Sequence, residues 1–295
     1  RTPRGAGCGA PGALGCPACL GLADKNTLGG GDMSWMDIPP DGLGQGSPIA
    51  VRIVDTENDL YDAIALDMAG RIRAAGREGR PCLFIVPVGP VGQYRRLAEL
   101  CTRPRLDLRS VHLLNMDEYL DDQDRYIDHD DPLSFRGFMD REFYGLLDRD
   151  IAPPPGNRIF PEPGRESEIQ GRIERLGGVD TAYGGVGING HIAFNEPPDA
   201  AVAVEAFRDF RTRVLPISHE TRIVNSMKIG GCYDLMPGWC ISIGMKEILA
   251  ARKLRFYLNR TWQWGILRKV LFGPVTPGVP ASYLQGHADA RIVEI

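Results

Sequence analysis

The sequence lacks any apolar run of the roughly 20 residues that a membrane-spanning helix needs. It also lacks a strong charge of one sign, because 34 Lys and Arg residues and 38 Asp and Glu residues leave a formal net charge of −4. Acidic and basic residues are mixed along most of the chain. Neither nucleic acid nor a membrane is therefore an expected partner, and a small molecule is the expected ligand.

A regular cysteine pattern is absent as well. The seven cysteines are odd in number and irregularly spaced, which is typical of reduced thiols and predicts a cytoplasmic protein. Cys16 and Cys19 have the spacing of a metal or redox pair. A structural zinc site needs a second pair, however, and none follows at a suitable distance, so no metal is expected.

The first 47 residues are rich in Gly, Pro and Ala and show little hydrophobic periodicity. Such a segment buries too little apolar area to offset the entropy cost of ordering it, so residues 1–47 are predicted to form a disordered tail. A targeting peptide is not expected, because the segment has no Lys-headed apolar run and little arginine after Arg4. Met33 is an alternative candidate for the first residue.

From residue 48 onward, short apolar segments alternate with amphipathic ones, which predicts one α/β domain over residues 48–295. Strands are expected at 48–54, 82–86, 110–114, 213–216, 239–243, 254–258 and 290–294, with another beginning at 181. Helices are expected at 57–78, 134–147, 166–176, 219–226, 245–251 and 264–271, with another through 94–100. This order predicts a mostly parallel, Rossmann-like open sheet flanked by helices, with no internal repeat.

Ligands of such sheets bind beyond the carboxyl ends of the strands, which directs attention to three loops: 87–92, 115–119 and 184–197. The third loop contains Gly185, Gly187 and Gly190 in the G-x-G-x-x-G spacing of dinucleotide sites. A dinucleotide loop opens a long helix, whereas the prolines at 197–198 stop any helix here after about one turn. We interpret the match as coincidental, although Glu205 near the ribose-binding distance keeps that alternative open.

The glycines of this loop instead allow the backbone to approach a ligand on which polar side chains act. The ordinary pKa of histidine, about 6.5, suits His191 to proton transfer, and Glu196 can orient it. Asp117 follows a buried strand, where partial desolvation raises the pKa of a carboxyl group and makes it a usable base. The structural alternatives are helix capping by His191 and an N-cap at Asp117.

From about residue 50 to the C-terminus, the sequence resembles the glucosamine-6-phosphate deaminase (isomerase) family. The matching segments agree in order and spacing: NMDEY at 115–119, SFRGFMDREFY at 134–144, GGVGINGHIAFNEP at 184–197, RTRV at 211–214, TRIVNS at 221–226 and PASYLQGHADARIVEI at 280–295. The GHIAFNEP string is highly specific. In the related 6-phosphogluconolactonases the same loop resembles GxDGHTASLFP, so the FNEP ending favours the deaminase branch.

The resemblance implies a cofactor-free aldose-ketose isomerisation that converts glucosamine 6-phosphate to fructose 6-phosphate and ammonia. By analogy, His191 would shuttle the proton that opens the pyranose ring, with Glu196 tuning it. Asp117 would remove the C2 proton of the open-chain amino sugar and return a proton at C1, after which hydrolysis of an imine releases ammonia. Family members are often oligomeric, so a homo-oligomer is one of the open expectations.

The histidine loop departs from the family pattern at Asn189, where the family usually has Asp two residues before the histidine. An amide can orient the His191 ring but cannot stabilise an imidazolium by charge. We therefore expect slower or differently tuned ring opening.

The phosphate loop departs further, because PVGPVG replaces the family's PTGSTP-like segment. The family's two basic positions fall at Met227 and Gln263, while Arg260 is close enough to substitute. Backbone amides of residues 88–92 can still hold an anion. Substrate binding is predicted for Gly89, Pro90, Val91, Gly187, Gly190 and Arg260. Two alternatives stay open: a catalytically weak sugar-phosphate sensor, and a related isomerase or lactonase with an altered substrate.

Overall fold

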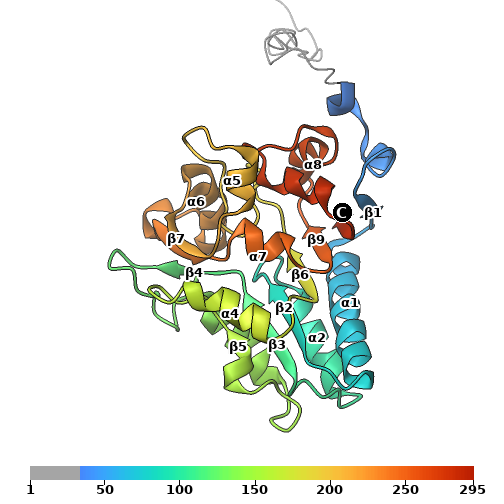
Figure 1. Ribbon diagram of the computed structural model, residues 1–295, viewed down its shortest axis with the longest axis vertical. Coiled ribbons are helices and arrows are strands. Elements are labelled where there is room, and N and C mark those ends of the chain that lie inside the picture. Colours follow the sequence, from blue (N-terminus) through green and yellow to red (C-terminus); the bar gives the residue numbers. More distant parts are fainter. Residues whose placement is uncertain (1–33) are drawn as a thin grey trace, which may run out of the picture.

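The structure is a computed structural model that describes residues 34–295. Its main sheet has seven strands in the order β1-β10-β9-β6-β2-β3-β5, and every neighbouring pair is parallel. The predicted fold class, one α/β domain with a mostly parallel sheet flanked by helices, is confirmed (Figure 1). In chain order the strands are β1 (Ala50–Ile53), β2 (Cys82–Val86), β3 (Val111–Asn115), β5 (Arg158–Ile159), β6 (Thr181–Gly184), β9 (Leu254–Leu258) and β10 (Ala290–Glu294).

Helices cover both faces of this sheet because its central strands are apolar on both sides. All five residues of β2 are buried. Cys82, Phe84 and Val86 pack in one core with α1 (Glu57–Arg77) and α2 (Gln93–Thr102). Leu83 and Ile85 point the other way, into a core with α4 (Ser167–Arg175), α7 (Met245–Leu249) and α8 (Gln263–Phe272). This alternation follows from the two-residue period of a strand.

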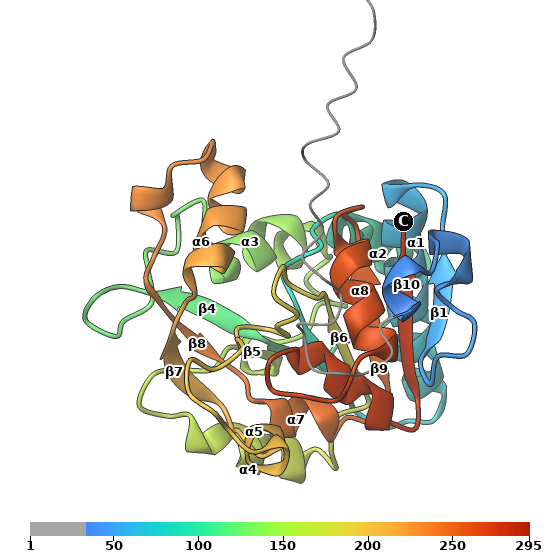
Figure 2. The same cartoon turned by 90° about the horizontal axis from the view of Figure 1, so that it is seen from above.

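A second, three-stranded sheet was not predicted from the sequence. It consists of β4 (Asp117–Leu120), β8 (Trp239–Ser242) and β7 (Arg213–Pro216), and both of its pairings are antiparallel. Figure 2 shows these three strands together at the left, away from β1 and β10. Two of the three segments were predicted as strands, but their partners lie far apart along the chain. Local periodicity identifies a strand and does not identify its partner.

The remaining helices largely agree with the sequence pattern. α3 (Phe135–Glu142) ends earlier than expected and is followed by a short 3-10 turn at Tyr144–Leu146. α6 (His219–Ser226) has the predicted bounds, and α5 (Val204–Arg208) was not predicted. Among residues 34–295, no helix has both the length and the apolar character that a bilayer crossing requires.

The chain changes direction in the main sheet at β2. β3 pairs with one edge of β2 and β6 with the other. Within this sheet, the chain after β2 continues to β3 on one side, whereas the chain after β6 continues to β9 on the other side. In open α/β sheets, such a switch point opens a crevice at the carboxyl ends of the strands. The two Gly-rich loops, at 87–92 and 185–197, both border it.

The predicted tail over residues 1–47 is only partly within the structure, because residues 1–33 lie outside the described residues. Residues 34–47 contain two short 3-10 helices, Ser34–Asp37 and Pro40–Gly42. Leu43 is fully buried, and the Ile38 carbonyl accepts a 2.7 Å hydrogen bond from Arg268 Nε of α8. Residues 34–47 therefore pack on the domain, whereas the sequence predicted that they are disordered. The difference arises because Leu43 is buried in the core, which the local composition does not indicate.

Truncating Leu43 tests this packing. The Leu43→Ala variant is expected to lose about 2–5 kcal/mol of unfolding free energy, since it leaves a cavity in the core. The matched control is Met36→Ala, whose side chain is 41% exposed, and it should stay within about 0.5 kcal/mol of wild type. Urea unfolding of the three proteins provides the measurement, and equal midpoints for all three would contradict the packing.

Candidate active site

A cleft of about 620 Å³ opens at the carboxyl ends of β2, β3, β6 and β9. Its walls come from the loop at 87–92, the start of β4, the loop after β6, the segment after β9, and α6 with the following 3-10 turn Met227–Ile229. Its volume lies in the range typical of small-molecule sites. Both Asp117 and His191 line it, so two of the predicted chemical groups share one cavity.

Asp117 is the first residue of β4 and is 8% exposed. The preceding residue holds it in place: Met116 N donates to Val86 O of the main sheet at 3.0 Å, and Met116 O accepts from Ile243 N at 2.8 Å. Burial raises the pKa of Asp117 to about 8, with a further contribution from the charge of Glu118, while Lys228 opposes the shift. The carboxyl group thus exchanges its proton near neutral pH.

The His191 ring is held by acceptors on its Nδ1 side. Nδ1 lies 2.8 Å from Asn189 Oδ1 and 3.2 Å from Glu196 Oε2. Both oxygens are hydrogen-bond acceptors, so Nδ1 carries the proton and donates it. Nε2 is then the unprotonated nitrogen that can act as a base. Thr221 Oγ1 is a third neighbour, at 3.2 Å from Nδ1.

Asn189 bridges the histidine and the glutamate. Its Oδ1 contacts His191 Nδ1, and its Nδ2 donates to Glu196 Oε2. Burial would raise the pKa of Glu196, but the charge of His191 and hydrogen bonds from His191, Asn189 and Thr221 together lower it to about 2. Glu196 is therefore a carboxylate at any pH at which the protein is expected to work.

The glycines of the loop have different functions. A Cβ on Gly187 would lie 2.0 Å from His191 Cε1, so only glycine lets the ring lie against the backbone there. Gly190 has a φ of +87°, and a Cβ on it would lie 2.8 Å from Val279 Cγ1. Gly187 lines the cleft, whereas Gly190 is absent from the lining and packs behind the loop. The predicted substrate contact at Gly190 is thus not part of the cleft wall.

Two polar residues tie the histidine loop to the small sheet. Asn195 is fully buried, and its Nδ2 donates to the carbonyls of Ile192 (3.1 Å) and Ile243 (2.9 Å). Ser242 Oγ accepts from Phe194 N at 3.0 Å, and Ser242 is also the strand partner of Asp117. The elements that carry His191 and Asp117 are consequently fixed to the same residue.

The other predicted site residues divide into two groups. Gly89, Pro90, Val91 and Arg260 line the cleft, while Asn189 and Glu196 lie behind His191 rather than in the wall. Gln263, at the position where the resemblance predicts a lysine, is 5% exposed. Its Nε2 donates to Val186 O at 2.6 Å and its Oε1 accepts from Arg260 N at 2.9 Å. Gln263 therefore joins the loop after β6 to the start of α8.

Lys228 was missed by the sequence analysis. It lines the cleft, where desolvation lowers its pKa, the Asp117 carboxyl opposes that change, and the charge of Arg260 adds to it. The sequence did contain a signal, since Lys228 directly follows Met227, the position at which a basic residue was expected. Both Met227 and Lys228 line the cleft, so the neighbouring position supplies the cation. Within residues 34–295, no group of three or more His, Cys, Asp or Glu side chains is arranged to hold a metal ion.

Comparison with known proteins yields a consistent set of relatives. No family model matches the chain. The chain is 32% identical over 210 residues to a glucosamine-6-phosphate deaminase of Lachnoclostridium phytofermentans, covering 69% of this chain and 82% of that protein. It is 30% identical over 249 residues to the enzyme of the same name from Porphyromonas gingivalis, covering 82% and 89% of the two chains.

Solved structures agree at the level of the fold. A monomeric glucosamine-6-phosphate deaminase superposes with a TM-score of 0.71 at 24% identity, covering 83% of this chain and 96% of that one. A 6-phosphogluconolactonase from Thermotoga maritima superposes with a TM-score of 0.59 at 14% identity, covering 83% and 97%. The named relatives show that this α/β protein is an enzyme of the deaminase and isomerase kind. The chain belongs to the glucosamine-6-phosphate deaminase family.

The buried Asp117 predicts a pH-dependent cost in stability. An unfolded aspartate titrates near a pKa of about 3.9, whereas the folded pKa is about 8. The folded state holds the Asp117 proton more tightly than the unfolded state does. Proton binding at Asp117 therefore contributes fully to the free energy of unfolding below about pH 4, and this contribution is lost as the pH rises to about 8. Asp117→Asn should therefore exceed wild type in unfolding free energy by an amount that grows over this range, on the order of a few kcal/mol at pH 8.

Urea unfolding at about pH 5 and pH 8 measures the difference. Asp122→Asn is the control, because Asp122 is exposed and its offset from wild type should be the same at both values. An offset for Asp117→Asn that does not change with pH would contradict the raised pKa.

Proposed function

We propose that the protein converts glucosamine 6-phosphate to fructose 6-phosphate and ammonia by general acid-base catalysis. The observation that carries the proposal is the shared cleft of Asp117 and His191, whose proton-exchanging groups differ in kind and lie on separate elements. Such a reaction needs two proton transfers at different atoms of the sugar. The named relatives, which are 32% and 30% identical to this chain, support the substrate.

Ring opening is the first step. It moves a proton from the C1 hydroxyl to the ring oxygen, and His191 Nε2 is the atom that carries it. The contacts of Nδ1 with Asn189 and Glu196 keep the ring oriented, and the Glu196 carboxylate compensates the charge of the imidazolium while the proton is held.

Isomerisation and deamination follow at C1 and C2. The Asp117 carboxylate removes the C2 proton of the open-chain aldehyde, while one proton of the substrate's C2 ammonium group passes to the C1 oxygen, and an enolamine forms. The same carboxyl group then returns its proton to C1. The product is an iminium at C2; water adds to it, and ammonia leaves to give the ketose. A base with a pKa of about 8 both takes and returns a proton readily near neutral pH.

Lys228 and Arg260 are the cations proposed for the phosphate group. Both line the cleft, and the charge of Arg260 lowers the pKa of Lys228. A phosphate dianion between them relieves this repulsion and forms charge-assisted hydrogen bonds. Backbone N–H groups of the loop at 88–92, next to the N-terminus of α2, add further donors.

Ammonia release from glucosamine 6-phosphate is the direct test. Wild type is expected to release ammonia and fructose 6-phosphate in equal amounts, and Asp117→Asn to lose at least about a thousandfold in kcat, since its general base is gone. Asp122→Asn should keep wild-type kcat. Full activity of a folded Asp117→Asn protein would remove Asp117 from this role. No turnover by wild type, together with thermal stabilisation by another sugar phosphate, would favour the sensor or an altered substrate.

Replacing Lys228 tests the phosphate contact. Lys228→Met is expected to raise KM for glucosamine 6-phosphate about 10- to 100-fold, the loss of one hydrogen bond to a charged group, with a smaller effect on kcat. Lys246→Met is the matched control, because Lys246 lies on α7 and pairs with Asp209. Steady-state ammonia assays give both constants, and an unchanged KM in Lys228→Met would exclude this contact.

A further inference from the structure

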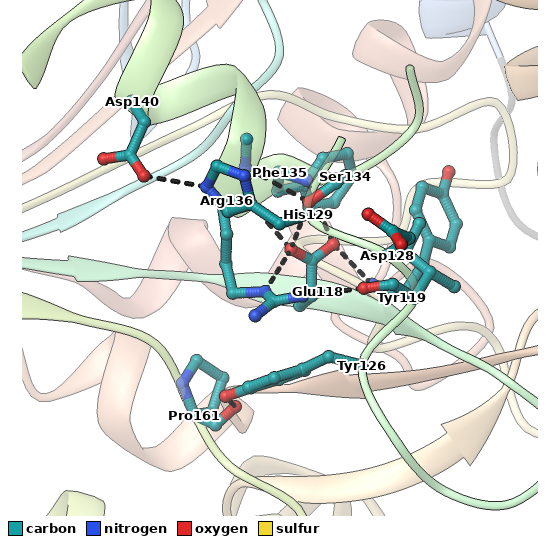
Figure 3. A network of polar contacts seen from close by, with 12 residues as sticks. Glu118, Tyr119, Tyr126, Asp128, His129, Ser134, Phe135, Arg136, Asp140 and Pro161 are labelled. Carbon is teal, nitrogen blue, oxygen red and sulfur yellow. Dashed lines mark hydrogen bonds and ion pairs between the residues drawn. The ribbon is translucent and has the colours of Figure 1, made fainter. Parts of the chain in front are cut away.

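Glu118 is a fully buried carboxylate directly beside Asp117. Figure 3 shows it surrounded by donors from β4 and the start of α3. Its oxygens accept from the backbone N–H groups of Tyr119 (2.9 Å), Phe135 (3.0 Å) and Arg136 (2.8 Å). Arg136 Nε and Ser134 Oγ each lie 3.3 Å from Oε2.

These contacts place the carboxylate at the N-terminus of α3. Phe135 and Arg136 are the first two residues of that helix, and their N–H groups have no partner within it. A negative charge there is stabilised by the helix dipole. Burial raises the pKa of Glu118, while the backbone N–H groups and the Arg136 charge oppose that change. The Glu118 carboxyl oxygens are the acceptors in all of these hydrogen bonds, as expected for an anion.

Arg136 extends the network to two further segments. Its Nη2 donates to Ile127 O at 2.7 Å, and its guanidinium lies over the Tyr126 ring, 4.2 Å from the centroid. Tyr126 donates from its hydroxyl to Pro161 O at 2.6 Å. Glu118 thereby connects β4 with the segment at 126–136 and, through Arg136 and Tyr126, with the chain before α4 (Figure 3).

The same network reaches the cleft from the opposite side of β4. Successive side chains of a strand point to opposite faces, so Asp117 lines the cleft while Glu118 faces α3. Phe135 also lines the cleft, and its ring packs 4.9 Å from Tyr119 and 6.5 Å from Phe194. Phe194 belongs to the loop that carries His191.

Few charged groups act on Asp117. Among the described residues, Glu118 on β4 raises its pKa and Lys228 of the turn after α6 lowers it. Three further titratable groups surround it, Tyr94 of α2, Tyr119 of β4 and Cys240 of β8, and burial raises the pKa of each, so they are neutral. Glu118, at the next position of β4, is accordingly the anion whose charge acts on Asp117.

We propose that Glu118 is a positioning residue of this enzyme: it ties β4 to the N-terminus of α3, which fixes the Asp117 carboxyl in the cleft, and it keeps an anion next to that group. The proposal rests on the role of Asp117 as the base in the proposed function. Glu118 itself touches no substrate, because it lies behind the cleft wall.

The proposal separates two contributions that different variants remove. Glu118→Gln removes the charge and keeps the size of the side chain. Glu118→Asp keeps the charge but shortens the reach to the backbone N–H groups of α3. Ser134→Ala removes the hydroxyl that caps α3 by accepting from Gly137 N at 3.1 Å, and leaves the Glu118 charge in place.

Carboxyl titration by ¹³C NMR of the ligand-free proteins measures the charge contribution without turnover. The resonance that is missing in Asp117→Asn identifies Asp117. In Glu118→Gln, Asp117 is expected to titrate at lower pH than in wild type. In Ser134→Ala the thermal midpoint is expected to fall while the Asp117 titration stays at the wild-type pH. An unchanged Asp117 titration in folded Glu118→Gln would overturn the electrostatic part of the proposal.

The pH profile of kcat provides the second readout. Asp117 must be ionised to act as a base, so the acidic limb in Glu118→Gln should move to lower pH by the shift seen in the NMR titration. Well below the wild-type midpoint, kcat as a fraction of its plateau should rise about tenfold for each unit of that shift. Glu118→Asp should retain the wild-type limb but lose at least about tenfold in kcat with KM unchanged.

Two outcomes keep this proposal distinct from the proposed function. If wild type releases no ammonia but Glu118→Gln still shifts the Asp117 titration, the proposed reaction fails and the placement of an anion beside Asp117 stands. If wild type is active and Glu118→Asp has wild-type kcat, the positioning role of Glu118 fails. The second comparison applies even if Glu118→Gln does not fold.

Discussion

The site depends on the point at which the chain leaves the main sheet. Met116 hydrogen-bonds through its N–H to β2 and through its carbonyl to Ile243, just after β8. One residue is thus held by both sheets, and the next residue, Asp117, begins β4 opposite Ser242. The loop with His191 is anchored to the same Ser242 through Phe194. Two side chains more than seventy positions apart in the sequence are therefore set by one shared junction.

Two carboxyl groups of the site have pKa values shifted in opposite directions. Asp117 has little to compensate its burial and an anion beside it, so its pKa rises to about 8. Glu196 is also largely buried, but contacts with His191, Asn189 and Thr221 lower its pKa to about 2. Such opposed shifts separate a group that exchanges protons from one that stays charged. The cost of keeping Asp117 in this state is paid in stability at neutral pH.

The departures from the family pattern acquire a physical meaning in the structure. Asn189 accepts from the histidine side and donates to Glu196, which an aspartate could not do without placing two carboxylates against each other. Lys228, one residue after Met227, contributes a cation to the cleft. Gln263 connects two segments of the wall by hydrogen bonds. These substitutions alter how the site is built, while Asp117 and His191 both line the cleft.

The sequence by itself determined the fold class, the bounds of most helices and strands, and the loops that border the cleft, because hydrophobic periodicity and glycine positions are local properties. It also pointed to Asp117 and His191, since both follow strands. Only the tertiary structure decided that β4, β7 and β8 form a separate sheet, that Lys228 faces the cleft, that Gly190 does not line it, and that Glu118 lies against α3. The small sheet depends on pairing between distant strands, and the other three depend on how a turn, a loop and a helix pack against segments far away in the sequence, which no single segment encodes.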